Sequence, residues 1–321
     1  MPDNSQPLNH HFSELGTARP PSMDAGQLDL GSSLYSDVGR AYDKGMAEFA
    51  SLDSYYAFEK SVRWKARFVH DEQTQDFLKV VLETSTLRLR TIPKGQILFR
   101  AQRGFTWRTE RRGEEDEFEV ETALGPERMV PKAALVGDGR VNPSKIPSLY
   151  LASNRNTAMA EVRPWVGSRI SLAEFKLMRD CVVVDCSADQ KRSWQFQIID
   201  LNARVQPREP SAADKEAGVW GDIAYAFSEP VDVDDPNSDY LPTQILAETF
   251  RGRKYDGIVY KSLLDERGKN IALFDVSSAE LISRCLFEAK TLRFEFDQVE
   301  NPYFVARHYP ELARSAAQEG A

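Results

Sequence analysis

Apolar residues recur at helical spacing between residues 33 and 86. The segments that show this pattern are AYDKGMAEFASL, SYYAFEKSVRWKARF and EQTQDFLKVVLETS. Asp53 or Ser54 is placed to cap the second helix and Asp71 the third, because their side chains can accept a hydrogen bond from a first-turn amide. We therefore expect a helical N-terminal extension. Residues 1–32 are rich in Pro, Ser, Asn, Gly and Asp without a period, and predict a disordered arm.

The period of the pattern shortens from residue 87 onward. Short apolar or alternating runs, typical of strands, occur at LRLRTIP, QILFRAQ, SLYLAS, ISLAEFKL, CVVVDCS, YDGIVYKS and NIALFDVSS. Helical patterns lie among them, at about 156–162 and in YLPTQILAETFRG. Strands and helices mixed in this way predict an α+β domain over residues 87–290. The short, well-separated strands do not suggest a doubly wound nucleotide fold.

Three further segments depart from this pattern. Residues 104–138 are charged, punctuated by glycine and contain RRGEEDEFEVET, which predicts an insert folded as an exposed hairpin. Residues 208–238 are interpreted as loop-rich. Residues 291–321 are interpreted as a C-terminal helical tail, with the helix at about 303–317.

Composition narrows the function classes. The chain has 321 residues, 41% hydrophobic and 28% charged, which allows a sizeable core and excludes wholesale disorder. Its formal net charge of -8 makes direct nucleic-acid binding unexpected, because phosphate contacts need clustered Lys and Arg. Three cysteines, Cys181, Cys186 and Cys285, form no disulfide framework and favour a reducing compartment. No signal-peptide pattern or membrane-length apolar stretch is evident, so we expect a cytoplasmic protein, with signal-less export left open.

The sequence offers little to hold a metal or a resident cofactor. The adjacent His10 and His11 lack further ligands nearby, and DVDDPNSD lacks the glycine and closing glutamate of a calcium loop. No dinucleotide fingerprint, phosphate loop or nucleophile elbow is present. The chemistry must therefore use Arg, Tyr, Glu, Ser and backbone groups. That set suits a reaction in which a cation develops.

Six motifs occur in a fixed order. They are LFRAQ with Arg100, GRVNPSKIPSLYLAS with Asn142 and Tyr150, TAMAEV with Glu161, YLPTQILAETF, YDGIVYKS with Ser262, and NIALF with Asn270. Each motif alone is a weak signal. The ordered set resembles the RES domain family, named for its Arg, Glu and Ser, over roughly residues 89 to 275.

The resemblance implies a fold and an activity. It implies an α+β domain with ADP-ribosyltransferase-like mixed sheets and flanking helices. It also implies an enzyme that degrades NAD by cleaving the nicotinamide–ribose bond, with water or phosphate as acceptor. NAD would then be the substrate and phosphate a candidate co-substrate. Several such enzymes serve as toxins of toxin–antitoxin pairs, so the expected partner is a helix-turn-helix antitoxin or an immunity-type protein, and a homodimer is a further expectation.

Two of the residues suit the breaking of an N-glycosidic bond. The reaction generates an oxocarbenium-like ribose, and a fixed carboxylate such as Glu161 stabilises that cation in the transition state. Arg100 offers a planar, permanently charged fork for a pair of phosphate oxygens. Taken singly, a helix glutamate is usually solvated and a strand arginine usually a surface charge, so these roles rest on the ordered motifs.

The remaining four residues are assigned by the same resemblance. Tyr150 can stack on nicotinamide or ribose and still donate a hydrogen bond. Ser262 and Asn270 can hold the pyrophosphate or the ribose, and Asn142 can contact substrate or support its loop. We thus expect Arg100, Tyr150, Glu161 and Ser262 as catalytic residues. Arg100, Tyr150, Asn142 and Asn270 are expected to bind substrate.

Two alternatives to NAD degradation stay open. The chain could transfer ADP-ribose to a macromolecule, with the 104–138 insert recognising the target. It could also bind NAD or ADP-ribose without turnover. The Arg, Tyr, Glu and Ser set speaks against a pure binder, which has no need of a carboxylate beside the ribose.

Overall fold

The structure is a computed structural model of the chain, and it describes residues 47–112, 116–188, 192–195, 209–229 and 240–293, with 295 and 298. The predicted arm at 1–32 and the predicted C-terminal helix at 303–317 lie outside the described residues.

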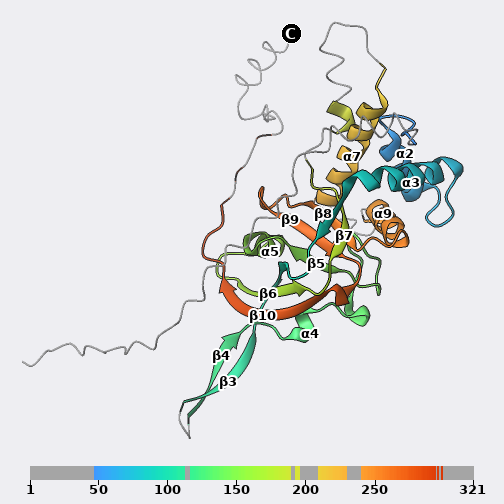
Figure 1. Ribbon diagram of the computed structural model, residues 1–321. Coiled ribbons are helices and arrows are strands. Elements are labelled where there is room, and N and C mark those ends of the chain that lie inside the picture. The colour runs from blue at the N-terminus through green and yellow to red at the C-terminus, as the bar shows by residue number, and fades with distance from the viewer. Residues whose placement is uncertain are drawn as a thin grey trace, which may run out of the picture.

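An eight-stranded sheet forms the centre of the fold (Figure 1). Its strand order is β1-β7-β8-β9-β5-β2-β6-β10. The strands are β1 (Leu89–Ile92), β2 (Ile97–Arg103), β5 (Leu149–Ala152), β6 (Arg169–Leu177), β7 (Cys181–Asp185), β8 (Gly257–Lys261), β9 (Lys269–Leu273) and β10 (Ala279–Glu288). Strands β7 and β8 pair in parallel, and the other neighbours pair antiparallel. The prediction of an α+β fold with a mixed sheet is confirmed.

The sheet separates into two parts between β5 and β2. These strands share a single residue pair, Phe99 with Ala152, whereas β2 and β6 stay paired from Ile97 to Arg103. Beyond Phe99, the strands β1, β7, β8, β9 and β5 therefore diverge from the strands β2, β6 and β10. The side chains that follow Phe99 on β2 border the resulting opening.

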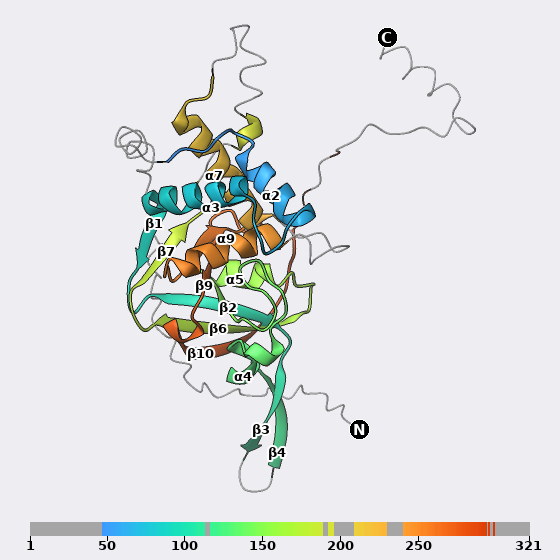
Figure 2. The ribbon, with the colours of Figure 1, turned by 90° about the vertical axis from the view of Figure 1, so that its right-hand side faces the viewer.

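Helices cover the sheet at one end of the molecule, where Figures 1 and 2 both show α2, α3, α7 and α9 gathered near β7, with β8 labelled beside it in Figure 1. They are α2 (Ser54–Trp64), α3 (Glu72–Ser85), α7 (Ala212–Ser228) and α9 (Leu241–Gly252). Asp53 is the N-cap residue of α2, and Asp71 caps α3 as predicted, accepting a 2.9 Å bond from the Thr74 amide. The short helix α5 (Arg155–Glu161) follows β5.

The N-terminal helices share a hydrophobic core with the sheet. Phe58 of α2 and Val81 of α3 are buried in one cluster with Trp220 of α7 and Ile258 of β8. Next to it, Arg88 of η1 (Thr86–Arg88) pairs with Glu216 at 3.3 Å, and both side chains are nearly inaccessible to solvent. The extension is thus packed into the same body as the domain that follows it.

The interpretation of residues 208–238 as loop-rich was wrong for 212–228, which form α7. A capping box between Ser211 and Asp214 begins this helix. Its two glycines resemble loop punctuation in the sequence. In the fold, Gly218 permits close packing, since a Cβ there would lie 2.8 Å from Leu52 Cδ2 and 3.2 Å from Ser193 Cα.

The C-terminal part of the domain, residues 269–288, also differs from what the sequence pattern predicted. The strand predicted across NIALFDVSS ends at Leu273 as β9, and η3 (Val276–Ser278) follows. Strand β10, which the pattern did not indicate, then covers the sheet edge beside β6. Most of its side chains are exposed or half-buried, so it lacks the alternation that marks a strand buried on one face.

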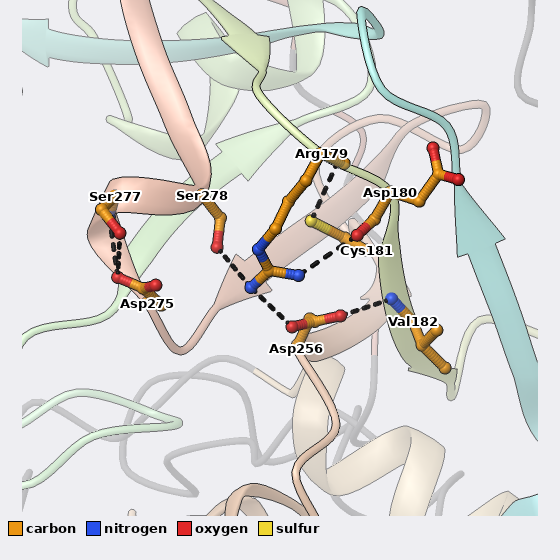
Figure 3. A network of polar contacts seen from close by, with 8 residues as sticks. All are labelled: Arg179, Asp180, Cys181, Val182, Asp256, Asp275, Ser277 and Ser278. Carbon is orange, nitrogen blue, oxygen red and sulfur yellow. Dashed lines mark hydrogen bonds and ion pairs between the residues drawn. The ribbon is translucent and has the colours of Figure 1, made fainter.

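A polar network fixes the turn between β6 and β7 (Figure 3). Arg179 pairs with Asp256 at 2.7 Å and donates to Ser278 Oγ at 3.0 Å, while Asp256 Oδ2 accepts from the Val182 amide at 2.7 Å. Cys181 is buried beside it, and desolvation raises the pKa of its thiol.

The predicted insert contains an exposed hairpin, as expected. Strands β3 (Thr106–Arg112) and β4 (Asp116–Thr122) form a separate two-stranded sheet, which projects from the body in Figures 1 and 2. The rest of the insert folds back as α4 (Pro126–Met129) and η2 (Ala133–Leu135). Within the described part of the chain, no helix has the length and apolar character to span a membrane.

Candidate active site

A cleft of about 850 Å³ opens where the sheet divides. Its lining includes Arg100 on β2, Tyr150 on β5, Glu161 on α5 and Asn270 on β9. The volume lies within the range of small-molecule sites. Four of the six residues that the sequence singled out therefore border one cavity, although up to 170 positions separate them in the sequence.

Glu161 is held in place by two neutral donors. Ser262 Oγ and Asn270 Nδ2 each donate to Glu161 Oε1 at 2.7 Å. Ser262 lies just beyond β8 and Asn270 lies on β9, and both are buried. Glu161 itself is exposed on the cleft side. The bonds restrict the carboxylate to one orientation without neutralising its charge.

The helix that carries Glu161 is short and closely packed. Asn154 caps it by accepting a 2.8 Å bond from the Thr157 amide. Ala158 packs in a small cluster with Phe99 and Ala152, the residue pair that joins the two parts of the sheet. Small side chains thus let α5 lie close to the split, so that its last residue, Glu161, reaches the cleft.

Arg100 spans the split between β2 and β5. Its Nη1 donates to the Tyr150 carbonyl at 3.1 Å, and desolvation by burial lowers the pKa of the guanidinium from its ordinary value. Among the described residues no carboxylate forms an ion pair with it, and its buried Nε has no hydrogen-bond partner there. Gln102, two positions along the strand, also presents a buried Oε1 without a partner in that part of the chain. Buried groups of this kind indicate a place for a polar ligand.

Further arginines make the cleft predominantly positive. Arg103, Arg128 and Arg163 line it together with Arg100, and among the described lining residues Glu161 is the one carboxylate. Sequence reasoning missed these three residues. Arg163 could have been noticed beside Glu161 and ahead of Pro164, but Arg128 lies in the insert, where no signal connects it with the cleft.

Tyr150 and Asn142 anchor the loop that precedes β5. Tyr150 Oη donates to Asn142 Oδ1 at 2.7 Å and accepts from the Val141 amide at 3.0 Å. Asn142 Nδ2 donates to the Gly137 and Pro143 carbonyls at 3.1 and 3.0 Å. Because these partners occupy both polar groups, the geometry favours loop support over substrate contact for Asn142. It leaves the ring of Tyr150, rather than its hydroxyl, to face a ligand.

Comparison with known families gives a clear result. The family model described as "RES domain" matches residues 105–297, more than half of the chain. The chain belongs to the RES domain family. The matched span contains Asn142, Tyr150, Glu161, Ser262 and Asn270, whereas Arg100 lies shortly before it.

Among solved structures, the chain is similar to one described as the crystal structure of the M. tuberculosis MbcT–MbcA toxin–antitoxin complex. The sequence identity is 13%, the match covers 65% of this chain and 92% of that one, and the TM-score is 0.33. No curated protein matches the chain.

Other motif residues of this RES domain act as supports. Gln244, in the YLPTQ motif on α9, donates to the Gly139 and Asn142 carbonyls at 2.9 and 3.0 Å. Arg140, in the GRVNP segment, donates to the Ala226 carbonyl at 2.7 Å. These bonds fasten the loop before β5 to α9 and α7. Motifs far apart in the sequence thus hold Tyr150 at the cleft without lining it themselves.

Among the described residues, no group of three His, Cys, Asp or Glu side chains is placed to hold a metal ion.

Proposed function

We propose that this RES domain cleaves the nicotinamide–ribose bond of NAD. The observation that carries the proposal is the Glu161 carboxylate, fixed by Ser262 and Asn270 in a cleft that also contains the buried guanidinium of Arg100, which forms no ion pair with any described residue. A fixed anion beside an otherwise positive cleft suits a substrate with a cationic reacting centre and an anionic pyrophosphate.

Each side chain then has a role in the reaction. As the bond breaks, its electron pair leaves with neutral nicotinamide and positive charge develops on the ribose, where Glu161 stabilises it. Arg100 binds a phosphate oxygen pair with its fork, and the Tyr150 ring packs against nicotinamide or ribose. Ser262 and Asn270 act through Glu161, which they orient.

The acceptor completes the reaction. An acceptor oxygen forms a bond to the ribose carbon that nicotinamide leaves, and the acceptor's proton passes to solvent. Water would give ADP-ribose, whereas inorganic phosphate would give ADP-ribose phosphorylated at that carbon. The excess of arginines in the cleft favours phosphate, because an anionic co-substrate is attracted to a positive site.

We further propose that the protein is a toxin restrained by an antitoxin. Membership of the RES domain family supports this role, and an enzyme that depletes NAD needs restraint in the cell that makes it. The helix-turn-helix type of antitoxin and the cytoplasmic site of action remain part of the same proposal.

One observation favours a second candidate, ADP-ribosyl transfer to a macromolecule. The projecting β3–β4 hairpin follows directly on Arg103, which lines the cleft, and it exposes Trp107 and Phe118. A hairpin in that position could recognise a target and bring its acceptor group to the bound NAD.

Analysis of the reaction products distinguishes NAD cleavage from ADP-ribosyl transfer and from binding without turnover. The purified protein is incubated with NAD, with and without inorganic phosphate, and the products are identified by mass spectrometry. We expect free nicotinamide, with phosphorylated ADP-ribose when phosphate is present. ADP-ribose attached to an added protein or nucleic acid would favour the transferase. Tight ADP-ribose binding without nicotinamide release would identify a binding protein and refute the proposed reaction.

A further inference from the structure

Trp165 is an exposed aromatic residue at the border of the cleft. The residue is one of those that line the cavity, and it is 70% exposed. It lies on the segment between α5 and β6, four positions after Glu161. A single exposed indole has no special meaning by itself. Trp165, however, borders a cleft that also contains several arginines, so the way its backbone is fixed bears on its function.

The backbone around Trp165 is fastened at several points. Its amide donates to Ser168 Oγ at 2.9 Å, and the Ser168 amide donates to the Trp165 carbonyl, also at 2.9 Å. The Gly167 amide donates to the Ala289 carbonyl at 2.7 Å, next to the end of β10. Gly167 has a φ of 85°, a conformation that glycine adopts without strain. The turn therefore presents the indole from a defined backbone.

We propose that Trp165 binds the adenine ring of NAD by stacking, which makes it a specificity residue of this site. This inference rests on the proposed function. Glu161 marks the position of the nicotinamide ribose, and the arginines provide for the pyrophosphate between the two halves of the dinucleotide. The exposed indole of Trp165, at the border of the cleft, would then contact the adenosine half of NAD. Aromatic side chains stack on any base, because every base has a π face.

The nicotinamide ring is the competing partner for this indole. Nicotinamide in NAD is cationic, and a cation also binds the face of tryptophan. That ring must lie at Glu161, however, where the Tyr150 side chain is available to it. The Trp165 indole would also serve a protein-docking patch with Val166, which is 64% exposed. Comparing ligands with and without adenine distinguishes adenine stacking from nicotinamide binding and from protein docking.

The test compares Trp165→Ala and Trp165→Phe with the parent protein. Binding of ADP-ribose, which carries adenine and no nicotinamide, is measured by calorimetry. The ratio of kcat/KM for NAD to that for nicotinamide mononucleotide, which lacks the adenosine phosphate half, is measured by nicotinamide release. Trp64→Ala is the matched control, because Trp64 is 79% exposed at the end of α2 and does not line the cleft.

We expect Trp165→Ala to weaken ADP-ribose binding by about tenfold and to lower the NAD preference by a similar factor, the scale of one base stack. Trp165→Phe should retain most of both, and Trp64→Ala should match the parent. Unchanged ADP-ribose affinity in Trp165→Ala, an unchanged preference ratio, or a parent protein that does not bind ADP-ribose would overturn the inference. If the parent binds ADP-ribose but releases no nicotinamide, the proposed reaction fails while the binding data still decide the role of Trp165.

Discussion

At the scale of single residues, Arg100 is the side chain whose environment most demands a ligand. Burying a guanidinium costs free energy unless an anion compensates it, and Arg100 Nη1 donates to the Tyr150 carbonyl rather than to a carboxylate. A ligand phosphate would supply the missing charge.

Replacing Arg100 should therefore affect substrate binding as well as turnover. We expect Arg100→Ala to raise KM for NAD and lower kcat, since the phosphate contact exists in the ground state and in the transition state. Arg100→Lys keeps the charge but loses the fork, and should recover only part of the binding. Steady-state kinetics measure both constants, with the exposed Arg253→Ala as control. An unaltered KM in Arg100→Ala would remove the arginine from the binding site.

Tyr150 offers a residue-scale test that separates support from chemistry. Tyr150→Phe keeps the ring but leaves Asn142 Oδ1 and the Val141 amide without their partner, at a cost of about 1–3 kcal/mol in unfolding free energy. Urea unfolding should show this loss, and Asn142→Ala in the same background should add less than its effect alone. Full stability combined with loss of turnover would instead place the hydroxyl in the reaction.

At the scale of elements, the sequence predicted most of those with a clear period and missed those without one. The helix predicted across AYDKGMAEFASL was wrong for residues 47–52, which are irregular, with a bend and a turn, rather than helical. The helices at α2, α3 and α9 have apolar faces at helical spacing, and the strands around the cleft are short apolar runs. Helix α7 is buried on several sides, so it has glycines and small residues where an amphipathic helix would show a polar face. Strand β10 lies at the sheet edge with exposed side chains on both faces. Tertiary packing, which the local pattern does not record, decides both.

Helix α7 is also tied to the N-terminal helices by charge. Arg88 is buried against Glu216 and lies over the Trp220 ring at 4.3 Å. We expect Glu216→Ala to lower the unfolding free energy by about 3–5 kcal/mol, because it leaves a buried cation uncompensated. Urea unfolding measures this, and Glu248→Ala on the exposed side of α9 should change it little. A loss below about 1 kcal/mol would show that Arg88 finds other compensation.

At the scale of the whole molecule, the site is assembled by a sheet that divides. The ordered motifs identified its main residues, because Arg100, Tyr150, Glu161 and Asn270 all border the cleft. Their division of labour could not be predicted. The hydroxyl of Tyr150 serves Asn142, and Ser262 serves Glu161, because hydrogen-bond partners depend on how distant loops meet. The arginine from the insert and Trp165 reach the cleft for the same reason.

Buried tyrosines predict how the whole fold responds to alkaline pH. Desolvation raises the pKa of Tyr55, Tyr150 and Tyr260 above the ordinary value of about 10. Their contribution to stability is fully present below that pH and is lost as the pH rises through the folded-state pKa. Tm should therefore fall steeply above about pH 10, and less steeply in Tyr260→Phe. Equal slopes for the two proteins would mean that other groups control alkaline unfolding.

The comparison of Glu161→Gln with the parent protein tests the central claim most directly. The substitution keeps the size of the side chain and an oxygen that can accept from Ser262 and Asn270, and it removes the charge. At saturating NAD, we predict that nicotinamide release falls by roughly 10²-fold or more, the scale of about 2.7 kcal/mol for one preorganised electrostatic contact, while ADP-ribose binding stays close to that of the parent. The exposed Glu280→Gln on β10 should release nicotinamide at the parent rate. A Glu161→Gln protein that releases nicotinamide as fast as its parent would contradict the account, because the carboxylate would then have no part in the reaction.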